Sequence, residues 1–169
     1  MTFHHDHQVG PRLAAALVNA TTPRAYESLL VQHGVRKPSL TTGDEQALGT
    51  WVGVLRTVFT APDLDARCAA SNELLAQAGG ALYLSTHDGT PPHLHLAPDE
   101  HDVVARVRSV TAGGIAFFVA WGAGRRMGVC ARPGCERVFI DVSRAGRQRY
   151  CTARCGNTDA VSRHRGRIH

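Results

Sequence analysis

Aromatic residues are scarce in this sequence, since Phe, Trp and Tyr together make up 6% of its 169 residues. Hydrophobic residues of all kinds still reach 43%, so we expect a globular chain with a core built from Leu, Val and Ala. No apolar run approaches the roughly 20 residues that cross a bilayer. The start of the chain also lacks the basic-then-apolar layout of a secretory signal. These absences predict a cytoplasmic protein without a membrane partner.

Motifs of several common enzyme classes are missing as well. The sequence has no Gly-rich phosphate loop, no nucleophile elbow and no metalloprotease helix motif, which favours a protein that is not an enzyme. The rival interpretation is a catalytic cleft that uses Asp44, Glu45 and histidines. Acidic residues at this place are more typical of favourable charge at a helix N-terminus.

Apolar residues at helical spacing predict four helices in the first half of the chain. They fall within residues 11–20, 21–34, 41–60 and 61–80. Two alternating segments at 81–85 and 91–98 flank turn-forming residues and predict a small antiparallel β-hairpin. Apolar periodicity resumes from Asp99 to Trp121, where Gly113 and Gly114 weaken the prediction of one continuous helix.

Two polar or reactive residues within the first four helices have simple structural interpretations. Asn19 lies near the end of the first helix, where we expect it to cap the helix or to hold neighbouring loops together. Cys68 shares an apolar stripe of the fourth helix with Leu64, Leu74, Leu75 and Ala78, so we expect it to be a buried small apolar residue.

Charge divides the chain into two parts. Residues 1–124 hold 8 Lys and Arg against 11 Asp and Glu, whereas residues 125–169 hold 11 arginines against 3 acidic residues. A glycine-rich stretch from Gly122 to Arg126 marks the change. The fold class predicted is α+β, with a mainly helical domain over 1–124 followed by a small basic domain over 125–169. A basic end on a mildly acidic body points to a polyanion partner for that end.

Four of the five cysteines lie in the basic end, with the spacing C-x4-C-x15-C-x3-C. They are Cys130, Cys135, Cys151 and Cys155. Two close pairs of thiols supply two edges of the tetrahedron that zinc prefers, and a full set of four ligands leaves no open position. The spacing therefore predicts one structural zinc ion. Incidental reduced thiols and disulfides are the alternatives, and a reducing compartment disfavours the second.

Histidines form a competing candidate metal site. His93 and His95 alternate along a predicted strand, and a further histidine cluster lies at residues 4–7. Histidines on a strand face are more often polar surface residues, so the cysteines remain the predicted site.

The order of elements around the cysteines predicts a treble-clef finger. Pro133 and Gly134 form a tight knuckle, and the segment after Cys135 alternates as a strand and is long enough to fold into a hairpin. Helical propensity then runs from Thr152 to about Arg165. A helix that is basic on both flanks suits binding to DNA through phosphate and base contacts.

The residues predicted to contact DNA are mostly arginines, which favour bidentate contacts with phosphate or guanine. They are Arg144, Arg147, Arg149, Arg154, Asn157, Arg163, His164, Arg165 and Arg167. RNA binding is an alternative, and so is a finger that docks onto an acidic protein surface without binding nucleic acid.

The segment from Cys130 to Asn157 resembles the CGNR zinc finger. Members of that family read Cys-x4-Cys, an apolar strand, Asp-x-Ser-Arg-x-Gly-x-Arg-x-(Trp/Tyr)-Cys, and then Cys-Gly-Asn-Arg at the start of a basic helix. The matching residues after the first cysteine pair are Asp141, Ser143, Arg144, Gly146, Arg149, Tyr150, Cys151, Cys155, Gly156 and Asn157. Thr158 replaces the final arginine of the motif, and the second cysteine pair is one residue closer than in many members.

The resemblance implies a transcription regulator that contacts DNA through the finger. Such fingers usually follow an N-terminal ABATE domain, and residues 15–21 look like a weakened copy of its signature. That domain is implied to act in sensing or assembly, so a second copy of the chain or a small-molecule effector could bind it. With Thr158 at this position, the phosphate or intramolecular contact that the family arginine implies is lacking, and Arg154 could supply it.

Overall fold

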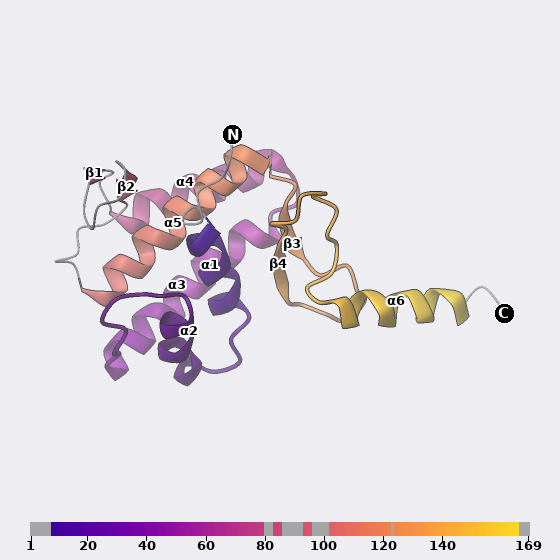
Figure 1. Cartoon of the computed structure of the whole chain (residues 1–169), viewed down its shortest axis with the longest axis horizontal. Helices are drawn as coiled ribbons and strands as arrows, with labels where there is room; N and C mark the ends of the chain where they lie inside the picture. The colour runs from indigo at the N-terminus through magenta and orange to yellow at the C-terminus, as the bar shows by residue number, and fades with distance from the viewer. Residues whose placement is uncertain (1–7, 80–82, 86–92, 96–101, 123, 166–169) are drawn as a thin grey trace.

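The computed structural model of the chain describes residues 8–79, 83–85, 93–95, 102–122 and 124–165. Its elements are α1 (Val9–Val18), the 3-10 helix η2 (Pro23–Ala25), α2 (Tyr26–Gln32), α3 (Thr42–Thr60), α4 (Leu64–Ala78), β1 (Tyr83–Ser85), β2 (His93–His95), α5 (Val103–Gly122), β3 (Met127–Val129), β4 (Val138–Ile140) and α6 (Ala153–Arg165). The predicted α+β fold class is confirmed, with helices packed together at one end and α6 extending away at the other (Figure 1).

Local caps fix the ends of the longer helices. The side chain of Thr41 accepts a hydrogen bond from the backbone N–H of Asp44, whose carboxylate accepts one from the N–H of Thr41. These bonds lower the pKa of Asp44. The side chain of Asp63 caps α4 by accepting a hydrogen bond from the N–H of Ala66, and Gly79 ends that helix with a φ of 65°. Asp44 therefore has the helix-terminal role that its position predicts.

The core forms around α5, which packs against α1, α3 and α4. As predicted, Leu, Val and Ala make up most of the buried apolar residues, although Trp51 and Phe59 are also almost fully buried. The indole N–H of Trp51 donates to the hydroxyl of Thr111 at 2.9 Å, and Thr111 donates in turn to the carbonyl of Val107. Each buried polar atom of this chain of bonds has a partner.

The helix α5 runs without a break through its two glycines. Gly114 is required by packing, because a Cβ atom there would lie 2.8 Å from both the Cα of Gly10 and the Cδ of Pro11. The two helices α1 and α5 approach at this point closely enough to exclude a side chain. Gly114, one of the two glycines that weakened the prediction of a continuous helix, is thus part of a helix crossing.

Alanine substitutions at two helical glycines should change stability in opposite directions. Gly114→Ala should lower the free energy of unfolding by about 1–3 kcal/mol, because α1 and α5 must move apart. Gly53→Ala in α3, where a Cβ would meet nothing within 4 Å, should raise it by about 0.5–1 kcal/mol. Chemical denaturation measures both. Equal effects at the two positions would contradict a close crossing of α1 and α5.

The apolar character of α5 departs from one expectation. By length and composition this 20-residue helix could cross a bilayer, whereas the sequence was expected to hold no such stretch. The structure buries 56% of its most apolar window inside the fold. A mostly buried helix of this kind is typical of the core of a soluble protein, in keeping with the attached finger.

The helix α4 buries only part of its predicted apolar stripe, in which Leu74 is fully buried. Leu64, Cys68 and Leu75 are exposed, so the expectation of a buried Cys68 is wrong. Beside Leu74, α4 carries the half-buried Arg67, which donates to the carbonyls of Val58, Ala61 and Gly124. Val58 and Ala61 belong to the last turn and C-cap of α3, and Gly124 follows α5, so Arg67 joins α4 to the ends of both helices.

Two antiparallel hairpins complete the described part of the chain. In the first, Tyr83 pairs with His95 and Ser85 with His93, which confirms the predicted hairpin. The side chains of His93 and His95, the turn between the strands and the histidines at 4–7 lie outside the described residues. The competing histidine site therefore has no structural test here.

The second hairpin joins the finger to the helices. Met127 of β3 pairs with Ile140 of β4, and Val129 pairs with Val138. Met127 and Val138 are buried in the same hydrophobic core as the helices. The hairpin flanks the first cysteine pair, so the expectation of a hairpin between the two pairs is wrong; only β4 lies there, and its partner precedes Cys130.

Asn19 holds α1 to this hairpin. It is the C-cap residue of α1, and its side-chain amide donates to the carbonyl of Val138 and accepts from the N–H of Val138, both at 2.8 Å. The amide thus pairs with the outer edge of β4 much as a neighbouring strand would. Arg56 of α3 adds a hydrogen bond to the carbonyl of Glu136. Both expectations for Asn19, capping and holding segments together, are met.

Candidate functional site

The four cysteines of the predicted zinc site lie together. Their sulfur atoms are all within 4.8 Å of one another, and the three distances among Cys135, Cys151 and Cys155 are 3.6, 3.8 and 3.9 Å. Sulfurs about 2.3 Å from a tetrahedral zinc are about 3.8 Å apart, whereas a disulfide needs about 2.05 Å. The spacing fits four ligands of one ion, and the site is that of one structural zinc.

Backbone hydrogen bonds form the knuckle that presents the first pair. The N–H of Cys135 donates to the carbonyl of Arg132, and Gly134 adopts a φ of 72°, which closes the turn. The N–H of Cys130 donates to the carbonyl of Arg137 across the hairpin. The N–H of Ala131 donates to the carbonyl of Arg149, which ties the knuckle to the segment leading to the second pair.

The second pair straddles the start of α6. Cys151 precedes the helix, and Cys155 lies in its first turn. The hydroxyl of Thr152 accepts from the N–H of Cys155 at 3.2 Å, as an N-cap residue does. This cap sets the direction in which Cys155 points, so that both sulfurs face the knuckle.

The thiols differ in acidity. Burial raises the pKa of Cys151 to about 12, and hydrogen bonds with the neighbouring sulfurs add to the shift. A hydrogen bond from Thr152 lowers the pKa of Cys155 to about 6, and one from the backbone of Arg137 lowers that of Cys135. Four thiolates at this distance repel one another, and a bound Zn²⁺ supplies the positive charge that stabilises them.

Arg132 is a residue of the site whose role the sequence did not indicate. It lies between the cysteines of the first pair, and its hydrogen bonds to the sulfurs of Cys155 and Cys135 raise the pKa of its guanidinium. Its buried Nε has no hydrogen-bond partner among the described residues. The guanidinium therefore offsets part of the negative charge of the thiolates. Its place inside the knuckle was the available signal.

The loop after β4 is organised by one carboxylate. Asp141 accepts from the N–H and hydroxyl of Ser143 and, through its other oxygen, from the N–H of Gln148. Burial alone would raise the pKa of Asp141, but these bonds and the charge of Arg126 outweigh it, so the pKa is lowered. The loop closes at Gly146, whose φ of 61° and close approach to Arg126 suit glycine.

A second set of contacts fixes α6 against this loop. The hydroxyl of Tyr150 donates to the buried carboxylate of Asp159 at 2.7 Å, and the guanidinium of Arg163 donates to the same oxygen at 2.9 Å. A Cβ at Gly156 would lie 3.2 Å from the ring of Tyr150, so a glycine lets the ring pack on the helix. The motif residues on either side of the cysteines thus support the zinc site.

The knuckle, the hairpin and the helix carrying the last two ligands make this part of the chain a treble-clef zinc finger. The family model of the CGNR zinc finger matches residues 126–168, and the chain therefore carries a finger of that family. A search of the curated proteins found no match. The ABATE domain predicted for residues 1–124, and the boundary at 124, stay predictions.

The residues predicted to contact DNA fall into three groups, and all those described are exposed. Arg147, Arg149 and Asn157 line a groove of about 530 Å³ between the loop before Cys151 and the start of α6. Arg154, His164 and Arg165 lie along α6, and Arg163 is tied to Asp159. Arg144 lines a separate cavity against α5. Arg167 lies outside the described residues.

Proposed function

We propose that this zinc-finger protein is cytoplasmic, that it binds DNA and regulates transcription, and that it has no catalytic activity of its own. The zinc fixes a small basic unit in which the described arginines predicted to contact DNA are exposed, and the helical part serves as a regulatory or assembly domain like the ABATE domain. Two copies of the chain would supply two fingers. Tight and specific binding needs both, because a single small finger makes few contacts with DNA.

The groove between the loop and α6 carries this proposal. Arg147 and Arg149 line it from the loop, and Asn157 lines it from the first turns of α6. Guanidinium groups beside a helix N-terminus form an environment that a DNA phosphate occupies readily. No acidic residue lines the groove among the described residues.

The placement of α6 supports the same proposal. The helix projects away from the helical part of the molecule (Figure 1), so that Arg154 and Arg165 lie on an accessible surface. An extended helix of this kind can lie along a DNA groove without a clash from the rest of the chain. Arg163 contributes less in our proposal, because its guanidinium already binds Asp159.

A gel shift of the full chain on duplex DNA tests the proposal. Binding should weaken steeply with salt, and each of Arg149→Ala and Arg165→Ala should reduce the slope of log K against log salt by about 0.9 if each residue meets one phosphate. Chelation of zinc should abolish the shift. Arg24→Ala removes an exposed arginine from η2 and should change nothing. The full chain is used because its finger shares the helical core.

Docking onto another protein is the second candidate function. Exposed apolar residues on the finger favour it, because Val129 is 39% and Val161 is 50% exposed. A partner retained after nuclease treatment, together with no gel shift at low salt, would replace the DNA proposal with this one.

A further inference from the structure

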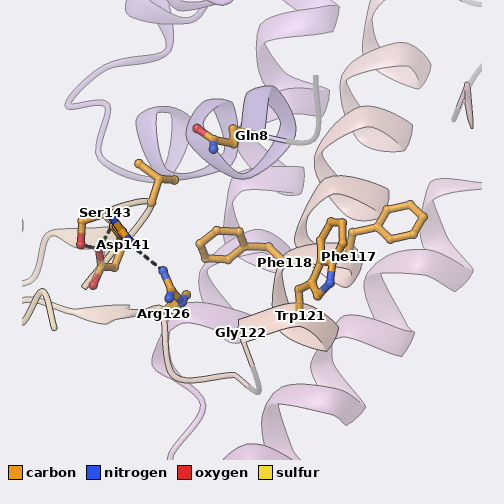
Figure 2. A pocket seen from close by; sticks show the side chains of 10 residues that line it. Gln8, Phe117, Phe118, Trp121, Gly122, Arg126, Asp141 and Ser143 are labelled. Atoms are coloured by element: carbon orange, nitrogen blue, oxygen red, sulfur yellow. Dashed lines mark hydrogen bonds between the residues drawn. The ribbon is translucent and has the colours of Figure 1, made fainter. Parts of the chain in front are cut away.

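A cavity of about 270 Å³ lies where the end of α5 faces the finger. Figure 2 shows the ring of Phe118 directed across it toward Asp141 and Ser143, with Gln8 on a third side and Arg126 at its edge. At about 30 Å³ per water molecule, this volume equals roughly nine waters, enough for a one- or two-ring compound. The helical part and the finger thus share one small site.

One wall of the cavity is aromatic in a chain with few aromatic residues. The sequence has 2 Trp, 3 Tyr and 5 Phe, and Phe117, Phe118 and Trp121 all line this site. Trp121 is 49% exposed, whereas Trp51 and Phe59 are buried in the core. Phe118 also packs against the core, whereas packing of the core does not explain the exposed Trp121. Such a wall beside a few convergent polar groups is typical of a small-molecule site.

Two arginines and one carboxylate are the charged residues of the cavity lining. Arg126 and Arg144 both line the cavity, and Asp141 is the acidic residue beside them. Both oxygens of Asp141 accept hydrogen bonds from the finger loop, and its single negative charge leaves the two arginines with a net positive charge at the cavity. Arg126 donates to the carbonyl of Ser143 at 2.7 Å, which holds its guanidinium at the edge of the cavity. The site therefore favours a negative group.

We propose that this cavity binds a small planar aromatic anion, such as an aromatic carboxylate. The ring would pack against Phe118 and Trp121, and the anionic group would lie beside Arg126 and Arg144. Guanidinium groups pair well with carboxylates in this way. The occupant would contact α5 and the finger loop together, because the cavity lies between them.

Calorimetric titration of the zinc-loaded full chain with 2-naphthoate tests the site, with the uncharged 2-naphthamide as its matched probe. We expect a dissociation constant of about 0.1 mM for the anion, as suits a ligand of this size. The amide should bind at least tenfold more weakly. Arg144→Gln should weaken naphthoate binding about tenfold, and Trp121→Ala at least fivefold. Arg24→Gln, which changes an exposed arginine that does not line the cavity, should bind like the unaltered chain.

Three results would overturn the assignment: equal affinity for the acid and the amide, unchanged affinity in either cavity variant, or no heat of binding at millimolar naphthoate. Thermal unfolding of each variant checks that the fold is retained. The chain is titrated without DNA, so failure here leaves the DNA proposal untouched, and failure of the gel shift leaves this one untouched.

Discussion

Replacing one zinc ligand should unfold the finger. In Cys151→Ser we expect zinc to fall well below one ion per chain, because structural zinc in finger peptides contributes about 10–16 kcal/mol of apparent binding free energy. A whole domain has a net stability of only about 5–15 kcal/mol. Elemental analysis measures the metal, and circular dichroism should show the loss of α6. Removal of zinc by a chelator should have the same effect on the unaltered chain.

Cys68→Ser is the matched control, because it alters the one cysteine that lies apart from the cluster and is exposed on α4. This variant should keep one zinc per chain and the same unfolding curve. Equal zinc content in Cys151→Ser and in the unaltered chain would contradict the four-cysteine site. Because Met127 and Val138 belong to the shared core, zinc removal should also lower the melting temperature of the helical part.

Replacing Asn19 should loosen the finger from the helices. Asn19→Ala leaves the N–H and the carbonyl of Val138 without their side-chain partner, and each half-buried group that loses a partner costs about 1–3 kcal/mol. We expect the free energy of unfolding to fall by about 2–4 kcal/mol in chemical denaturation. Asn19→Asp should also destabilise, because its carboxylate can accept from the N–H but places negative charge against the carbonyl oxygen.

Asn72→Ala, an exposed asparagine of α4, is the matched control and should change stability by less than about 0.5 kcal/mol. A similar small effect for Asn19→Ala would mean that β4 is held by core packing alone. Hydrogen exchange at the amide of Val138 gives a second measurement, since this N–H should lose protection first in the Asn19 variant.

The contacts of the motif residues give the finger a consistent physical logic. The zinc sets the positions of the knuckle and α6. Asp141 closes the loop between them, and the hydrogen bond from Tyr150 to Asp159 holds the helix against that loop. Thr158 occupies the last position of the motif, and its hydroxyl donates a hydrogen bond to the carbonyl of Arg154. The zinc site is complete without an arginine there.

The sequence by itself determined the zinc site and most helix ends. Cysteine spacing is local, and so are the caps at Thr41 and Asp63, which depend on residues three positions apart. Such features can be read without knowing the fold, because their partners are close along the chain. The hairpin of β1 and β2 was predictable for the same reason.

Only the tertiary structure decided which faces meet. The exposure of Cys68 follows from Arg67 reaching three carbonyls, and the role of Asn19 depends on a strand 119 residues away. The same holds for the close crossing at Gly114 and for the cavity between α5 and the finger loop. These contacts join segments distant in sequence, and their free energies depend on how the helices pack, which a periodic pattern does not specify.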